Sequence, residues 1–221
     1  MSQDIFEIIK SMDSNRFEIQ FALQCSPFIT GLKISNLFAI SISQHSKLEY
    51  ILTVSGYSFE KLYDTKNKVI YLLYDKKKLK EYLKKDIVRK ILYRLGYPYH
   101  IHKDIGKLLD IFKQKYVGYM ERKCEFPHEM GIFLGYPVED VVGYLKNNGE
   151  NSACVGYWKV YKNVEEKQKL FKEFEYAKES VIRYLAQGMN ILDVMKHYSC
   201  KDTFLSFNLI KKVSHFSAAE I

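Results

Sequence analysis

The chain has 221 residues, enough for one large domain or two small ones, and its 47% hydrophobic and 15% aromatic content is typical of a packed globular protein and excludes a disordered one. A net charge of +8 permits attraction to nucleic acid, anionic ligands or membrane surfaces and requires none of them. The four cysteines lie far apart and no stretch is apolar over a bilayer's length, so we expect a cytoplasmic protein with reduced thiols, no metal motif and no membrane insertion.

The N-terminal third predicts short helices followed by a small group of strands. Residues 4–12 and 16–24 have apolar residues at helical spacing. The second helix is expected to end at Cys25-Ser26-Pro27, because the residue before a proline avoids helical geometry. Residues 44–56 predict a connecting helix or loop. Three runs predict strands, and the turn residues 64–67 join the last two into a hairpin: Leu37–Ile42, Phe59–Tyr63 and Lys68–Tyr74.

A lysine-rich helix is predicted over residues 76–95. Its apolar positions keep helical spacing, its outer face carries much of the excess positive charge, and Gly96 followed by Pro98 is a good stop. A solvated surface is the common role of such a face, and a nucleic-acid surface is the alternative. Another helix is predicted over residues 104–118.

The segment Phe126–Leu145 has the sequence FPHEMGIFLGYPVEDVVGYL and is the part of the chain richest in residues that favour specific backbone positions, such as proline and glycine. It predicts a buried strand at Met130–Leu134, a turn at Gly135-Tyr136-Pro137 and a helix that begins at Pro137. A strand that leads into a helix N-terminus is a common way to build a binding site, because free N–H groups converge there.

The C-terminal part predicts a strand at Cys154–Tyr161 and a long helix that follows Asn163 and ends at Gly188. The sequence pattern of residues 181–212 then resembles a helix-turn-helix unit, with predicted helices separated by turns. A DNA reader would carry a polar recognition helix at Asp202–Lys212, but that segment is rich in phenylalanine and leucine. We therefore expect no sequence-specific nucleic-acid binding. A regulatory protein that uses helix 76–95 and this tail is the alternative function.

These patterns together predict an α/β or α+β fold. We expect a mixed β-sheet of about five strands, including one hairpin, with helices packed on it. Since no repeat or linker interrupts the chain, we expect one domain over residues 1–188 and a helical C-terminal appendage over residues 189–221.

Three segments carry a resemblance to a known family: CSPFITGLK (Cys25–Lys33), FPHEMGIFLGYPVEDVVGYL (Phe126–Leu145) and GYWKVY (Gly156–Tyr161). They resemble the domain of unknown function 3793 family of clostridia and related anaerobic bacteria, over roughly residues 17–185. The family name carries no established activity. The resemblance implies a link to redox or iron metabolism, which these residues themselves do not show.

The first functional hypothesis is a protein that binds a small anionic ligand or cofactor beside the segment Phe126–Leu145. The candidate ligand-binding residues are Lys33, His128, Gly135, Tyr136 and Lys159. They combine a turn before a helix N-terminus with lysines from the two other family-like segments.

An enzyme is a further hypothesis, with Cys25 as a nucleophile or with His128 and Glu129 as a base and its orienting carboxylate. A buried structural cysteine and a local hydrogen bond are the ordinary roles of these residues. The patterns specify neither a cofactor nor an oligomeric state.

Overall fold

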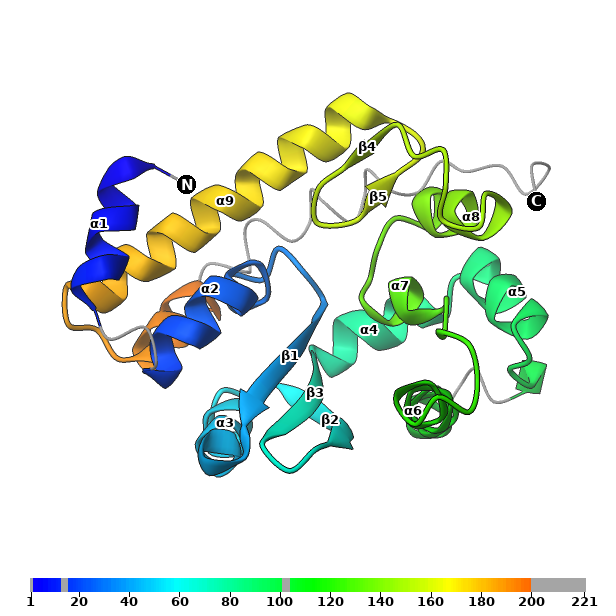
Figure 1. Ribbon diagram of the computed structural model, residues 1–221, viewed down its shortest axis with the longest axis horizontal. Coiled ribbons are helices and arrows are strands. Elements are labelled where there is room, and N and C mark those ends of the chain that lie inside the picture. Colours follow the sequence, from blue (N-terminus) through cyan, green and yellow to red (C-terminus); the bar gives the residue numbers. More distant parts are fainter. Residues whose placement is uncertain (1, 13–15, 101–103, 200–221) are drawn as a thin grey trace.

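The computed structural model describes residues 2–12, 16–100 and 104–199, and it combines helices with two small antiparallel sheets (Figure 1). The elements up to residue 74 are α1 (Gln3–Ser11), α2 (Phe17–Ile29), β1 (Ser35–Ser41), η1 (Ile42–Gln44), α3 (His45–Val54), β2 (Ser58–Asp64) and β3 (Lys68–Tyr74). The later elements are α4 (Lys76–Leu83), α5 (Asp86–Arg94), α6 (Ile105–Met120), α7 (Met130–Phe133), α8 (Val138–Lys146), β4 (Cys154–Val155), β5 (Lys159–Val160) and α9 (Val164–Ala186).

The larger sheet has the strand order β1-β3-β2, and both neighbours pair antiparallel with β3. The predicted hairpin over residues 59–74 is confirmed as β2 and β3. Alternate side chains of a strand point to opposite faces of a sheet. Val69, Tyr71 and Leu73 accordingly belong to one core, and Leu72 and Tyr74 to another. The central strand therefore separates two hydrophobic cores.

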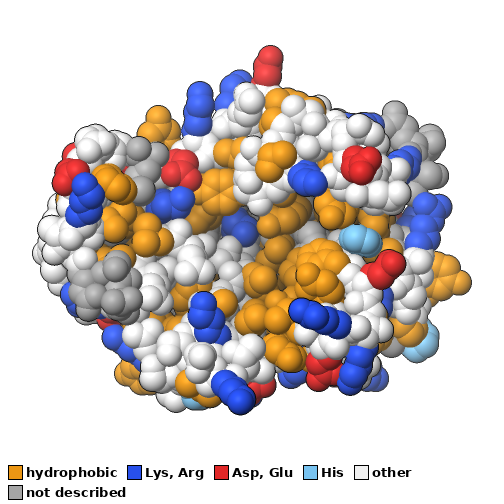
Figure 2. Space-filling model, viewed as in Figure 1, with side chains coloured by type: hydrophobic (Ala, Val, Ile, Leu, Met, Phe, Trp, Pro, Cys, Tyr) orange, Lys and Arg blue, Asp and Glu red, His pale blue; other side chains and the backbone are white. Residues whose placement is uncertain are grey.

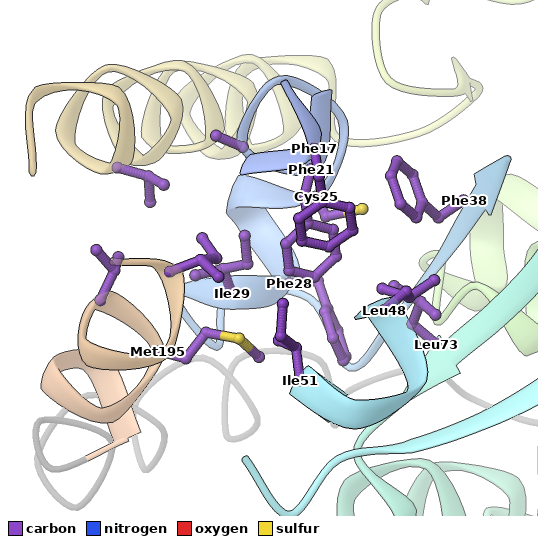
Figure 3. Close-up of a cluster of buried hydrophobic side chains, with 14 of the residues drawn as sticks. Phe17, Phe21, Cys25, Phe28, Ile29, Phe38, Leu48, Ile51, Leu73 and Met195 are labelled. Carbon is purple, nitrogen blue, oxygen red and sulfur yellow. The ribbon is translucent and has the colours of Figure 1, made fainter. Parts of the chain in front are cut away.

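The first core lies between the sheet and the helices α1, α2, α3 and α9, and Figure 3 shows its centre. Phe17 and Phe21 stack with ring centroids 5.5 Å apart, and Phe21 meets Phe38 of β1 at 5.3 Å. Cys25 is completely buried among them. The helical residues 191–199 add Ile191, Val194 and Met195 to the same core.

The second core lies between the other face of the sheet and helices α4 to α8. A third, smaller cluster joins the β4–β5 hairpin to the N-terminal half of α9, around Trp158, Val160 and Phe174. Helix α9 thus contributes to the first and the third cluster, and in Figure 1 it rises diagonally from α1 at the left to the β4–β5 hairpin at the top.

Two helix boundaries differ from the prediction. Helix α2 continues through Pro27 to Ile29, because Phe28 and Ile29 are fully buried and the hydroxyl of Ser26 donates to the carbonyl of Ala22 inside the helix. The predicted helix 76–95 is two helices, α4 and α5, with a break at Lys84 and Lys85. The break lets both apolar faces turn into the second core.

The predicted strand at Met130–Leu134 is wrong, since Met130–Phe133 is the short helix α7. An uninterrupted apolar run has no period that distinguishes a buried strand from one buried helical turn. The predicted segment Cys154–Tyr161 contains the two-residue strands β4 and β5, which pair only with each other. The helix-and-sheet class is confirmed, but the five strands form two antiparallel sheets and not one mixed sheet.

Residues 189–221 were expected to form an appendage. Their described part, residues 189–199, packs against the first core through the helix at 191–199. The predicted recognition segment Asp202–Lys212 lies outside the described residues.

Candidate functional site

The turn between α7 and α8 carries Tyr136, around which the candidate site is built. The N–H of Gly135 donates to the carbonyl of Ile132 and the N–H of Tyr136 to that of Gly131, which is the Schellman motif that ends many helices. Gly135 has a φ of +68°, and a Cβ there would lie 2.4 Å from Cγ1 of Ile34. Only glycine fits this position without displacing the side chain of Ile34, the residue before β1, so the turn holds Tyr136 at a fixed place against the sheet.

Two hydrogen bonds from outside the turn fix it further. The hydroxyl of Ser35 donates to the carbonyl of Phe133 at 2.6 Å, and the hydroxyl of Tyr82 donates to the carbonyl of Tyr136 at 2.7 Å. Phe133 is the last residue of α7 and Tyr136 lies beyond it, so the helix itself supplies no donor to either carbonyl. Elements β1 and α4 are therefore tied to the same short segment.

The rings of Tyr136 and Trp158 stack, with centroids 4.8 Å apart and planes inclined by 28°. Asp140 of α8 holds the indole in place: its carboxylate accepts hydrogen bonds from Nε1 of Trp158 at 2.8 Å, from the N–H of Tyr161 at 2.8 Å and from the N–H of Lys162 at 3.2 Å. Asp140 thus anchors the β4–β5 hairpin on α8.

A cavity of about 400 Å³ lies on one side of this pair, and we call it the lysine cavity. Its apolar wall includes Leu32, Leu134, Trp158, Leu170 and Phe174, and its charged wall includes Lys33, Lys77, Lys78, Lys85, Asp75 and Glu81. Lys33 is partly buried, its Nζ donates to Oδ1 of Asn36 at 2.8 Å, and burial lowers its pKa to about 8.

A second cavity of about 410 Å³ also has Tyr136 and Trp158 in its wall, and we call it the aromatic cavity. Four further aromatic rings line it, together with His128, Asp140 and Lys159: Tyr116, Tyr119, Phe126 and Tyr144. Nζ of Lys159 donates to the carbonyl of Gly149 at 2.6 Å. Figure 2 shows hydrophobic side chains gathered in a hollow in the middle of one face, between α9 and the β4–β5 hairpin above and the larger sheet below.

The five predicted ligand-binding residues all border these two cavities, although they do not share one site. Lys33 and Gly135 line the lysine cavity, His128 and Lys159 line the aromatic cavity, and Tyr136 lines both. The two lysines therefore do not face one ligand. Whether these residues bind a ligand stays a prediction.

The acidic residues at the start of α8 do not offer a free negative charge to either cavity. Glu139 pairs with Nζ of Lys167 at 2.6 Å, and both side chains are largely buried. Asp140 accepts the three hydrogen bonds described above. The N-terminal turn of α8 is thus used for internal contacts, so the cavities beside it and not its free N–H groups are the candidate binding surfaces.

The residues of the enzyme hypothesis lie in three different surroundings. The thiol of Cys25 is buried in the first core, accepts a hydrogen bond from Nδ2 of Asn36 at 3.3 Å and has a pKa raised by burial, which is the opposite of what a nucleophilic cysteine needs. Glu129 is buried, accepts a hydrogen bond from the hydroxyl of Tyr97 at 3.0 Å and forms an ion pair with Nζ of Lys115 at 2.9 Å. Neither partner is His128, which lines the aromatic cavity instead.

Sequence reasoning missed Lys77, Lys85 and Tyr82 as cavity residues. All three lie in the lysine-rich segment 76–95, whose predicted role is a solvated face because that is the common role of a lysine-rich helix face. The predicted helix is continuous, whereas the structure breaks it at Lys84 and Lys85. The break sets Lys85 against the ring of Tyr82, with Nζ 5.4 Å from the ring centroid.

Comparison with known proteins places the chain in a family. No curated protein and no solved structure matches it. Within the described residues, no helix combines the length and the apolar character that crossing a membrane requires. One family model, described as "Protein of unknown function (DUF3793)", matches residues 21–195, which include most of α2, every element from β1 to α9 and both cavities. Since this match covers most of the chain, the protein belongs to the DUF3793 family.

Proposed function

We propose that the protein binds a small organic anion with an apolar body, and that the lysine cavity is the binding site. One observation carries the proposal: Lys33 places a partly buried ammonium group at the cavity wall, and this group donates a hydrogen bond to the neutral side chain of Asn36. Burying a charge without a counter-charge is costly. A ligand carboxylate or phosphate would offset that cost.

The charges around the cavity support an anion. Among the described residues, no carboxylate lies within ion-pair distance of Lys33, Lys77 or Lys85. The two carboxylates in the wall are already compensated: Asp75 accepts from the N–H of Lys78 at the start of α4, and Glu81 pairs with Lys84 at 2.7 Å. The wall therefore has an excess of positive charge.

The rest of the wall indicates the body of the ligand. Leu32, Leu134 and Phe174 together with the ring of Trp158 form the apolar part of the wall. A volume of about 400 Å³ falls in the range of roughly 300–1,000 Å³ that is usual for small-molecule sites. An aryl phosphate or a medium-length carboxylate combines the two required features.

The proposal includes a cytoplasmic location. Cys25, Cys124 and Cys154 carry free thiols, and Cys124 is exposed. An exposed free thiol fits a reducing compartment better than an oxidising one.

A calorimetric titration with 1-naphthyl phosphate, octanoate and neutral 1-naphthol tests the site. The parent protein should bind 1-naphthyl phosphate at least about tenfold more tightly than 1-naphthol, equivalent to about 1.4 kcal/mol. The double variant Lys33→Met/Lys85→Met keeps apolar stems of similar length and removes two charges, so it should lose this preference while it still binds the neutral compound.

Lys90→Met is the matched control, because Lys90 is an exposed lysine of α5 that lines neither cavity. It should bind the anions as the parent does. If the double variant and the parent bind 1-naphthyl phosphate and octanoate equally, or if neither anion binds the parent, the lysine cavity is not an anion site.

A further inference from the structure

We propose that the amine of Lys33 forms a reversible covalent bond, a Schiff base, with an aldehyde or ketone whose other end carries an anionic group. This inference rests on the proposed function, because the ligand is the same organic anion in the lysine cavity with a carbonyl group added. It is carried by the position of the amine in the cavity, by the lack of a counter-charge beside it and by the other lysines of the wall.

The amine of Lys33 is held at a fixed point of the cavity wall, and its side chain is only partly buried. Nζ donates to Oδ1 of Asn36 at 2.8 Å and lies 5.6 Å from the ring centroid of Tyr136, which lines the same cavity. Asn36 is itself fixed, since its Nδ2 donates to the carbonyls of Gln24 at 3.1 Å and Leu37 at 2.9 Å. A ligand in the cavity therefore meets the amine in one defined position.

The surroundings of Lys33 favour the neutral amine. Among the described residues no carboxylate lies within ion-pair distance of it, and the thiol of Cys25, which accepts from Asn36, stays neutral because burial raises its pKa. Burial lowers the pKa of Lys33 to about 8. At pH 7 roughly one Lys33 side chain in ten is thus neutral, against about one in three thousand for a lysine with the ordinary pKa of 10.5.

A neutral, partly desolvated lysine beside a ligand site is the kind of amine that attacks carbonyl groups. The electron pair of Nζ forms a bond to the carbonyl carbon. The two hydrogens of the amine leave with the carbonyl oxygen as water and a C=N bond remains, so nothing is oxidised or reduced and no co-reactant is needed. The protonated imine keeps one N–H, and Oδ1 of Asn36 is the acceptor in place for it.

The other charges in the wall hold the anionic end of the ligand. The ionisable side chains that share the wall with Lys33 are Asp75, Lys77, Lys78, Glu81, Tyr82, Lys85 and Tyr136. The two carboxylates are engaged in the contacts described above, and burial raises the pKa of both tyrosines. Burial also lowers the pKa of Lys85, but the negative charge of Glu139 opposes that shift. Lys85 is therefore the better partner for an anion and Lys33 the better nucleophile.

Borohydride reduction traps an imine as a stable secondary amine. We would incubate the protein with 4-formylbenzoate, an aromatic aldehyde with a carboxylate at its far end, quench samples with sodium borohydride and locate the adduct by peptide mass spectrometry. Lys33 should be labelled at least about tenfold faster than Lys85 and than Lys90, an exposed lysine outside both cavities. Labelling of Lys33 should rise with pH and level off above about 8, whereas an ordinary lysine gains reactivity up to about pH 10.5. Uncharged 4-methylbenzaldehyde should label Lys33 more slowly.

The variant Lys33→Arg keeps a positive charge at the cavity but forms no imine, because a guanidinium group stays protonated. It should lose the adduct and still bind 4-methylbenzoate, an anion of the same shape without the carbonyl group, in calorimetric titrations. The peptide map of the parent is decisive even where this variant is too unstable to study.

The two compounds separate the possible failures. If the parent binds 4-methylbenzoate but Lys33 is labelled no faster than Lys85 and Lys90, the Schiff base is wrong and the anion site stands. If the parent binds neither compound, the anion site is wrong and this inference falls with it. Equal labelling of the parent and Lys33→Arg also overturns the Schiff base, since the adduct then lies on another lysine.

Discussion

Tyr136 stacks on Trp158 at a centroid distance of 4.8 Å, and both residues line both cavities. The two rings come from segments far apart in the chain, the α7–α8 turn and the β4–β5 hairpin. Their contact therefore depends on whatever holds the hairpin on α8, and Asp140 is the residue with the most hydrogen bonds across that junction.

Replacing Asp140 by asparagine should lower the free energy of unfolding by about 2–3 kcal/mol, because hydrogen bonds to a charged group contribute roughly 1.5–3 kcal/mol each and the new NH₂ group must face one of the present donors. Urea unfolding measures this loss, and the chemical shift of the Trp158 indole N–H should change with it. Glu150→Gln is the control at an exposed carboxylate and should be near neutral. An equal effect of both substitutions would contradict the anchoring role of Asp140.

Replacing Gly135 by alanine should cost clearly more than replacing Gly96 by alanine. Both glycines have positive φ values, +68° and +88°, so both variants pay the backbone penalty of roughly 1–2 kcal/mol. Only Gly135 adds a collision, with Ile34 at 2.4 Å, whereas a Cβ on Gly96 meets nothing within 4 Å. The excess should be about 1–3 kcal/mol in urea unfolding, as for overpacked cores. Similar losses of unfolding free energy in the two variants would show that the chain at Ile34 moves aside at little cost.

Anion binding in the lysine cavity should weaken as the pH rises through about 8. Burial lowers the pKa of Lys33 to about 8 from its ordinary 10.5, so the free protein loses this charge within that range. Calorimetric titrations with 1-naphthyl phosphate between pH 7 and pH 9, outside the titration of the phosphate, measure the trend. Lys33→Met should remove it.

The stability of the ligand-free protein should change in the opposite direction. Between about pH 8 and 10.5 the unfolded chain binds more protons at Lys33 than the folded protein does, so this residue makes stability rise with pH. The difference in unfolding free energy between the parent and Lys33→Met should therefore shift in favour of the parent across that window. A constant difference would mean that Lys33 titrates normally in the fold.

The described cysteines should differ in their reaction with iodoacetamide. Cys124 is exposed and should be alkylated first, Cys154 is partly exposed, and Cys25 is buried with a raised pKa and should react only when the protein opens. Mass spectrometry of peptides after timed quenching gives each rate. Denaturant should accelerate Cys25 most strongly. Rapid modification of Cys25 in the native protein would contradict its place in the first core.

Much of the fold was predictable where local chemistry decides it. The turn residues 64–67 correctly predicted the hairpin, and the glycines at 96 and 188 correctly marked helix ends, because each adopts a positive φ that other residues avoid. Local sequence patterns gave the wrong secondary structure where tertiary packing decides the conformation. The apolar run Met130–Leu134 is buried on all sides, and whether it becomes a strand or a helical turn depends on the space between β1 and α8.

The residues of the candidate site were predictable from the sequence, but their arrangement was not. Their residue types and the segments that carry them predict a binding role for Lys33, His128, Tyr136 and Lys159, and each lies in a cavity wall. The partition into two cavities could not be predicted. It depends on the contact between Trp158 and Tyr136, and the hydrogen bond from Trp158 to Asp140 positions that contact. Trp158 lies in the β4–β5 hairpin, whereas the sequence pattern predicts one continuous strand there.

The position of α9 has a consequence for how the chain folds during its synthesis. Val181, Ile182 and Leu185 complete the first core, Ser2 donates its backbone N–H to Glu179 at 2.5 Å, and Asp4 pairs with Arg183. The partners of α1 on α9 are thus translated 177 and 179 residues after the residues that they bind, and α9 also shares the first core with α2. Until α9 leaves the ribosome, the apolar surface that it covers on these two helices stays exposed. A chain stalled before residue 181 would present that unpaired surface to chaperones and to aggregation.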